Sequence, residues 1–372
     1  MNSDVQLIDI HGEPSLTISS DTVTAAMTLR GNHIAPVNFL VHGKNVNPYS
    51  LAPWLPGAHQ GIDPLLDVLR GDFWCLPFGE QPDGPAHGDV ARGNWKVVDV
   101  NEFSATFSIQ AQDIHAHITK TVSVRDGQNG LFQEITVSGL EGAYSYGTHP
   151  ILDLSYLPPG TARISTGAAR WSSVFTGMFS DPQAGETQVL EVGAEFTDLA
   201  HIPMADGGEL DLSSYPTPMA HEDLVMVVQH GDEHHLGWSA VSVPGHTWLA
   251  LKDVRDFPAT VFWVSNGGRT HIPWEGLHRG RLGVEDVCSY FHEGLVASRE
   301  NRLADKGIPT TKDFTATKDV TLRTLQAVVP TPENFGKVLN LSTPEPGIIR
   351  ITDEHGVSVD ADLDWSFVIR DE

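Results

Sequence analysis

The stretch that decides the fold is SATFSIQAQDIHAHITKTVSVRDGQNGLFQEITV, residues 104–137. Its segments Ser104–Ile109, His115–Val122 and Phe132–Val137 alternate between apolar and polar side chains and are rich in β-branched residues. This period of two is typical of half-buried strands, because successive side chains of a strand point to opposite faces. Asp126–Gly130 lies between the second and third segments and has the composition of a hairpin turn. The stretch therefore predicts antiparallel β-structure.

Strand signals continue along the rest of the chain. Three shorter apolar runs have the length of buried strands, namely Leu224–Val228, Trp248–Leu251 and Ala259–Val264. Thirty-five glycines and 24 prolines interrupt the sequence. Helical periodicity is weak, with short candidate helices near Pro64–Leu69 and Thr331–Leu339. We therefore expect an all-β protein of stacked, mainly antiparallel sheets with few short helices.

The two ends of the chain look like additions to this domain. No linker isolates either end, so residues 1–372 are expected to form a single domain with a core at about residues 20–330. The additions are N-terminal strands near Ser15–Ile18 and Val23–Leu29, and a final hairpin of Gly347–Ile351 with Val357–Val368.

The charge of the chain argues against several classes of partner. Lysine and arginine number 23 against 48 aspartates and glutamates, which gives a formal net charge of −25. A protein that binds the phosphate backbone needs a basic face, so we expect no nucleic-acid partner. An uncharged small molecule fits this acidic background better than a polyanion does.

The location of the protein is predicted from what the sequence lacks. No apolar stretch approaches the roughly 20 residues of a membrane span, and no secretory signal is visible at the start. The only cysteines, Cys75 and Cys288, have no zinc-type spacing and are interpreted as reduced core residues. We therefore expect a cytoplasmic protein without membrane contact, as a monomer or homodimer.

Three titratable residues stand next to glycine or β-branched residues in strand-and-turn surroundings. They are His87 in PAHGDVAR, His149 in GTHPILDL and Glu285 in LGVEDV. Two histidines and a carboxylate suit acid–base chemistry on a neutral substrate if the fold brings them together. Each also has a structural interpretation: a turn histidine, a hydrogen-bonded core histidine, and a carboxylate on the solvent side of an edge strand.

Metal and cofactor motifs are weak. The pairs His115/His117 and His234/His235 have no third and fourth ligand at a recognisable spacing. The phosphate-loop, dinucleotide-binding and nucleophile-elbow patterns do not occur. We therefore expect neither a metal nor an organic cofactor.

Aromatic residues fit a sugar site better than a metal centre. Trp95, Trp263 and Trp274 are rigid faces on which a pyranose can stack, although each also suits a hydrophobic core. The segment from Asn266 to Arg279 is rich in charged and aromatic groups and is expected to form a loop at the mouth of the site.

Read in order, the motifs resemble the aldose 1-epimerase (galactose mutarotase) superfamily, most closely its hexose-6-phosphate epimerase-like branch. The stretch LRGDFWCLPFG, residues 69–79, precedes His87-Gly88 and an arginine, as in that branch. His149 with the following Asp153-Leu154 is similar to the family's Asn-His-Ser/Thr-Tyr-Phe-Asn-Leu, and Glu285 matches its apolar-x-Val-Glu-Pro. The resemblance covers roughly residues 20–330.

The resemblance implies a β-supersandwich fold and a division of roles. In it, Glu285 takes the proton of the anomeric hydroxyl, His149 gives a proton to the ring oxygen, and His87 holds the pyranose. Arg70 and Arg92 match positions that hold the anionic group in the phosphate-using branch. The implied ligand is a sugar or sugar phosphate, interconverted between its α and β anomers without metal or organic cofactor. The remaining substrate-binding residues that we expect are Trp95, Asp153, Trp274 and His278.

Two other functions stay open at the level of sequence. A non-catalytic carbohydrate-binding or sensor protein would keep Trp95 and Trp274 as platforms while the trio does not converge. A lyase or hydrolase on the same fold would use Glu275, Glu285 or His278 in other roles.

Overall fold

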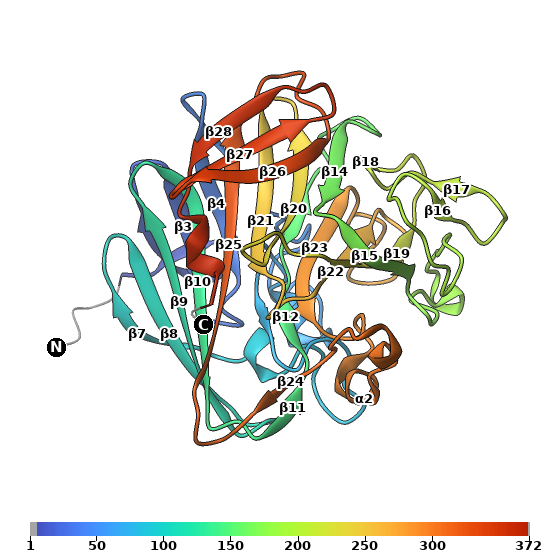
Figure 1. Ribbon diagram of the computed structural model, residues 1–372. Helices are drawn as coiled ribbons and strands as arrows, with labels where there is room; N and C mark the ends of the chain where they lie inside the picture. The colour runs from blue at the N-terminus through green and yellow to red at the C-terminus, as the bar shows by residue number, and fades with distance from the viewer. Residues whose placement is uncertain (1–5, 371–372) are drawn as a thin grey trace.

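The computed structural model describes residues 6–370, and two large antiparallel sheets occupy its centre (Figure 1). The larger sheet has nine strands in the order β18-β14-β20-β21-β25-β10-β9-β8-β7. The quoted stretch 104–137 supplies three of them. In sheet order the strands are Ser214–Tyr215, Ala162–Thr166, Leu236–Val243, His246–Asp253, Val320–Pro330, Gln128–Ser138, Ala116–Arg125, Ser104–Ala111 and Lys96–Val100.

The second large sheet has seven strands and carries the site described below. Its order is β15-β19-β22-β23-β12-β6, and β13 also pairs with β23. These strands are Ala169–Val174, Glu222–Gln229, Ala259–Ser265, Arg281–Cys288, Tyr146–Thr148, Trp74–Cys75 and, for β13, Ile151–Asp153.

The two large sheets share one apolar core. Phe262 and Val284 of the seven-stranded sheet belong to the same buried cluster as Trp248 and Val328 of the nine-stranded sheet. Trp263 follows Phe262 on β22, and Glu285 follows Val284 on β23. Because side chains alternate along a strand, Trp263 and Glu285 face away from the nine-stranded sheet. A separate cluster, which includes Trp263, covers this outer face.

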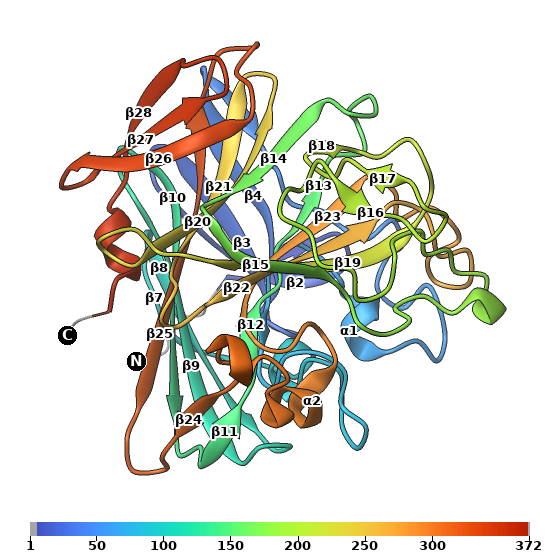
Figure 2. The same ribbon diagram turned by 45° about the vertical axis from the view of Figure 1, so that its right-hand side comes forward.

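Smaller elements surround the two sheets (Figure 1 and Figure 2). In both views the C-terminal sheet and α2 lie at opposite ends of the molecule. The N-terminal sheet has five strands, β1 Ile8–Ile10, β2 Glu13–Ser19, β3 Val23–Thr28, β4 Ile34–Val41 and β5 Lys44–Val46. The C-terminal sheet has three strands, β26 Val338–Glu345, β27 Ile348–Asp353 and β28 Ser358–Asp362. Two further sheets have two strands each, β11 Gly142–Tyr144 with β24 Lys312–Phe314 and β16 Ile202–Pro203 with β17 Glu209–Leu210. The α-helices are α1 Pro64–Asp67 and α2 Gly294–Glu300, and the short 3₁₀ turns are η1 Asp89–Ala91, η2 Pro182–Ala184, η3 Ala304–Lys306 and η4 Trp365–Val368.

The expected all-β architecture is confirmed, and so is the hairpin that the quoted stretch predicts. Arg125 pairs with Gln128 across the turn between β9 and β10. In β8 every second side chain is buried, as the period of two requires. One core-facing position of β9 is a buried lysine, Lys120, whose Nζ donates to the Asn32 carbonyl at 3.3 Å.

Two local expectations were wrong. Residues 331–339 form no helix: the chain turns there and enters β26 at Val338. The Gly336 and Lys337 amides donate instead to the carboxylates of Asp353 and Glu354 at 2.9 and 3.0 Å, which takes the place of helical hydrogen bonds. The predicted C-terminal hairpin is the β27–β28 pair, but β26 extends it to three strands, and residues 365–368 form η4 instead of a strand.

The candidate helix at residues 64–69 is present but ends at Asp67, and Asp63 caps its start by accepting a hydrogen bond from the Leu65 amide at 2.8 Å. Cys75 and Cys288 are both free and buried, as expected. Within residues 6–370, no helix combines the length and apolar character that crossing a bilayer requires.

Candidate active site

Strand register places His149 opposite Glu285. Gly147 of β12 pairs with Val287 of β23, and Ile151 of β13 pairs with Gly283 of the same strand. His149 lies midway between the two pairs, so its partner in the antiparallel register is Glu285. Directly opposed side chains share a sheet face. Backbone pairing therefore brings together two groups that lie 136 positions apart in the sequence.

The two side chains form a buried acid–base pair. His149 Nε2 lies 3.3 Å from Glu285 Oε1, and the residues are 6% and 2% exposed. Burial raises the pKa of Glu285 well above its usual range. Burial, with a smaller contribution from His87, lowers the pKa of His149 well below its usual range. Both shifts favour a neutral imidazole beside a neutral carboxylic acid. The pair then holds one transferable proton, which lies on the carboxyl group.

Glycine at position 283 makes room for the carboxylate. Gly283 and Glu285 lie two residues apart on β23, so their side chains point to the same face. A Cβ atom at position 283 would lie 2.5 Å from Glu285 Oε1 and 2.9 Å from the Trp263 Cβ. Any larger residue would therefore displace the acid.

His87 completes the trio from a loop. Its backbone φ is +60°, and at Gly88 a Cβ atom would lie 2.1 Å from the Leu76 carbonyl oxygen. Gly88 is therefore needed for the close approach of this loop to the Leu76 backbone. The Gly79 amide donates to His87 Nδ1 at 3.3 Å, which leaves the proton of the neutral ring on Nε2. Burial lowers the pKa of His87 to about 3, so the ring is a neutral donor 5.1 Å from the His149 ring, centroid to centroid.

Residues that the sequence did not single out hold His149 in place. Asp72 Oδ1 accepts a hydrogen bond from the His149 backbone amide at 2.9 Å. Asp72 Oδ2 is held by the side-chain amides of Gln133 at 2.6 Å and Gln326 at 2.7 Å, both from the nine-stranded sheet. The Phe73 ring stacks on the His149 ring with centroids 4.5 Å apart. The core therefore holds the backbone of His149, and the Phe73 ring restrains its imidazole.

All three residues open into one cavity of about 300 Å³. This volume is at the lower end of the range of small-molecule sites, about 300–1,000 Å³. Trp263 and Trp274 form part of its wall, with ring centroids 6.0 Å apart. The remaining lining residues are Asp63, Leu65, Leu66, Leu69, Phe73, Glu80, Ala86, Phe179, Glu186, Leu224, Arg269 and His292.

Each further carboxylate of the lining has a basic partner. Asp63 is paired with Arg92 at 3.1 Å, and Glu186 with Arg269 at 3.2 Å. Glu80 lies 3.5 Å from His292, whose contact lowers the pKa of that carboxyl. The cavity therefore presents no excess of positive charge.

The arginines expected to bind an anion have other partners. Arg70 is 1% exposed, and its guanidinium donates to the backbone carbonyls of Ile10 at 2.8 Å and His11 at 3.1 Å. Arg92 lies beside the cavity only through its pair with Asp63. Neither arginine is among the lining residues.

Of the other predicted ligand residues, Trp274 lines the cavity and three do not. Trp95 is buried and donates to the Val90 carbonyl at 2.9 Å. Asp153 pairs with Arg281 at 2.5 Å. His278 is buried behind the wall, where it stacks on Trp263 at 5.4 Å and contacts a serine hydroxyl.

The segment 266–279 does lie at the cavity, as the sequence predicted, through Arg269 and Trp274. Glu275, considered for other chemistries, is exposed and outside the lining. In the described part of the chain, no group of three or more histidine, cysteine, aspartate or glutamate side chains is arranged to hold a metal ion.

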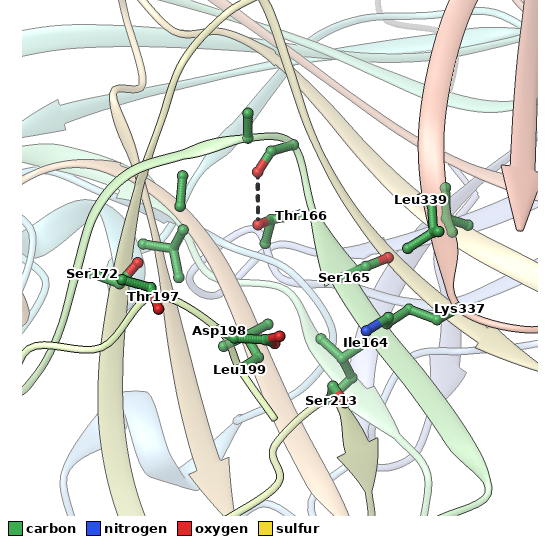
Figure 3. A pocket seen from close by; sticks show the side chains of 15 residues that line it. Ile164, Ser165, Thr166, Ser172, Thr197, Asp198, Leu199, Ser213, Lys337 and Leu339 are labelled. Carbon is green, nitrogen blue, oxygen red and sulfur yellow. Dashed lines mark hydrogen bonds between the residues drawn. The ribbon is translucent and has the colours of Figure 1, made fainter. Parts of the chain in front are cut away.

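A second hollow of about 230 Å³ lies away from the trio (Figure 3). It is lined by β14, β15 and the start of β26, with Ser165, Ser172 and Lys337 among its polar groups. It contains none of the predicted site residues, so the outer face of the seven-stranded sheet is the candidate active site.

The sequence matches no protein-family model and no curated protein. Solved structures do match. An aldose 1-epimerase candidate from Escherichia coli K12 is 13% identical, with a TM-score of 0.58 over 85% of this chain and 99% of its own. An aldose epimerase homologue from C. elegans is 13% identical, with a TM-score of 0.57 over 86% and 99%. A galactose mutarotase related enzyme from Lactobacillus acidophilus is 11% identical, with a TM-score of 0.55 over 86% and 98%.

These likenesses establish a galactose mutarotase-like fold. Identities of 11–13% carry the fold alone, so the activity has to be argued from the site.

Proposed function

We propose that the protein is an aldose 1-epimerase-type isomerase, which interconverts the α and β anomers of a sugar. The observation that carries the proposal is the opposed pair of His149 and Glu285, 3.3 Å apart, with His87 beside it in one cavity. Opening a cyclic hemiacetal requires a proton to leave the anomeric hydroxyl while another reaches the ring oxygen. One acid and one base, held side by side, supply both.

The pair holds the proton that this reaction requires. Neutral imidazole with carboxylic acid has the same proton count as imidazolium with carboxylate, so the two forms differ only in where the proton lies. With the proton on His149, Glu285 takes the hydroxyl proton, His149 protonates the ring oxygen, and the C1–O5 bond breaks as C1=O forms. Rotation about C1–C2 and closure on the other face give the second anomer. His87 Nε2–H is suited to donate to a sugar oxygen.

The charge of the cavity supports a sugar without phosphate. The guanidinium of Arg70 is committed to backbone carbonyls and that of Arg92 to Asp63, so neither is free for an anion. Glu80 and Glu186 also line the space. We expect free hexoses to react with a higher kcat/KM than hexose 6-phosphates.

The test is the rate of anomer equilibration of pure α-D-glucose and α-D-galactose, followed by polarimetry, with the 6-phosphates followed by NMR. Glu285→Gln keeps the size and the neutral charge of the buried group, so it should fold normally. It should also reduce kcat by roughly 10²–10⁴-fold, the usual contribution of a positioned acid or base. An unchanged rate in this variant would remove Glu285 from the mechanism, and an inactive wild-type protein would sink the proposal.

A further inference from the structure

Arg269 is held in the cavity wall by aromatic rings. Its Cζ lies 5.0 Å from the ring centroids of both Phe179 and Trp274, and 5.7 Å from that of Trp263. Its side chain is 15% exposed. A guanidinium between aromatic faces is restrained in position and orientation, because cation–π contacts act on it from several sides.

The hydrogen-bonding capacity of this guanidinium is largely unused. Nε lies 3.2 Å from Glu186 Oε1, which balances the charge. Nε itself is buried without a hydrogen bond, and within residues 6–370 neither Nη1 nor Nη2 donates one to the chain. Donors in a half-enclosed space gain free energy when acceptors arrive, because an unsatisfied polar group there is costly. Since Arg269 lines the cavity, these donors are accessible to a molecule bound there.

Distances to Trp263 limit how far Arg269 can lie from the acid–base pair. The His149 ring lies 5.7 Å from the Trp263 centroid, the same distance as the Arg269 Cζ. The two groups are therefore separated by at most twice that length, which a single hexose with hydrogen bonds at both ends can span. A hexose that spans this length from an anomeric carbon at His149 and Glu285 would present its C4 and C6 hydroxyls to the guanidinium.

The geometry points to Arg269 as the specificity-determining residue of the site, donating from Nη1 and Nη2 to the C4 and C6 hydroxyl oxygens of an uncharged hexose. This inference rests on the proposed function for the orientation of the sugar. Glu186 neutralises the arginine, so the terminal nitrogens bind hydroxyls without requiring an anion.

A purely structural role would have different consequences. Arg269 and Glu186 also form an isolated backbone bridge, and the Thr270 hydroxyl donates to the Gly185 carbonyl at 2.9 Å. These contacts tie two loops together. If Arg269 only stabilised the loops, Arg269→Met and Glu186→Gln would weaken all sugars equally.

The kinetic experiment compares kcat and KM for four sugars in wild type, Arg269→Met, Arg269→Lys and Glu186→Gln. D-galactose differs from D-glucose at C4, D-xylose lacks C6, and 2-deoxy-D-glucose differs beside the anomeric carbon. Arg269→Met should raise KM for D-glucose about 10- to 100-fold with a smaller change in kcat, since it removes hydrogen bonds from a charged donor. In this variant the differences in kcat/KM among glucose, galactose and xylose should disappear. The ratio of kcat/KM between D-glucose and 2-deoxy-D-glucose should stay at its wild-type value. Lysine should restore part of the preference, and Glu186→Gln should keep it.

A binding experiment separates this inference from the proposed function. Methyl β-D-glucopyranoside cannot open its ring, and its binding can be followed by the fluorescence of Trp263 and Trp274, which flank Arg269. Binding that weakens in Arg269→Met but not in Glu186→Gln supports the inference even if no epimerase activity is found. Equal binding by wild type and Arg269→Met, or sugar preferences unchanged in that variant, would overturn it while leaving the epimerase proposal intact.

Discussion

Replacing Gly283 by alanine should disable the site by moving one carboxylate. The added Cβ would lie 2.5 Å from Glu285 Oε1, whereas ordinary contacts begin near 3.4 Å. The oxygen must therefore retreat by about 0.9 Å, because the second neighbour, the Trp263 Cβ at 2.9 Å, blocks movement of the methyl group the other way. A displacement of roughly 1 Å in a reacting group costs about 10²-fold in rate, or ~2.7 kcal/mol of transition-state stabilisation.

The same change should cost about 1–3 kcal/mol of unfolding free energy, as overpacking of a filled core usually does. Polarimetry would give kcat/KM, and urea unfolding would give the stability. The matched control is Gly84→Ala, where the nearest atom to the new Cβ lies at an ordinary 3.6 Å and both quantities should stay at wild-type values. A folded Gly283→Ala protein with full kcat/KM would show that the carboxylate position does not control the reaction.

Three further outcomes follow from buried groups. Asp72→Ala should lower the free energy of unfolding by about 2–5 kcal/mol in urea titrations. The change leaves two glutamine amides without their acceptor and removes one acceptor of the His149 amide. A loss below about 1 kcal/mol would contradict this expectation. Burial lowers the pKa of His33 from 6.5 to about 3, so unfolding takes up a proton between these pH values. The free energy of unfolding therefore falls on acidification by about 1.4 kcal/mol per pH unit. The His33→Gln variant should lose less stability than wild type between pH 6.5 and 4.5, and equal losses would refute the lowered pKa of His33. Cys75 and Cys288 should react with Ellman's reagent only after unfolding, because burial raises the thiol pKa of the first well above its usual range and of the second to about 12; fast native-state labelling would count against their burial.

The sequence predicted the fold best where one face of a strand meets solvent. In β8 and β9 the alternation of side chains reports directly on burial, so the period of two identified the strands. In the seven-stranded sheet, β19 and β22 are buried on both faces, so their sequences show apolar runs without alternation. The helix expected at residues 331–339 does not form, because the Gly336 and Lys337 amides bind the carboxylates of Asp353 and Glu354, which a local apolar pattern does not reveal.

The trio could be singled out from sequence because its three motifs, taken in order, resemble those of the aldose 1-epimerase superfamily, although no single motif was sufficient. The residues around it could not, because their roles depend on distant partners. The Arg70 guanidinium donates to the carbonyls of Ile10 and His11, about sixty positions away in the sequence. The residues around Arg70 do not indicate these distant partners. Arg269 enters the cavity from a loop, and only the folded chain shows which aromatic rings enclose it.

The opposed register of β12, β13 and β23 also determines when the candidate site can form. Because main-chain pairing, across 136 positions of sequence, sets the separation of His149 and Glu285, a nascent chain that ends before β23 has no site at all. The proposed activity therefore depends on long-range sheet assembly. On unfolding, it should disappear together with the sheet and not at an earlier step.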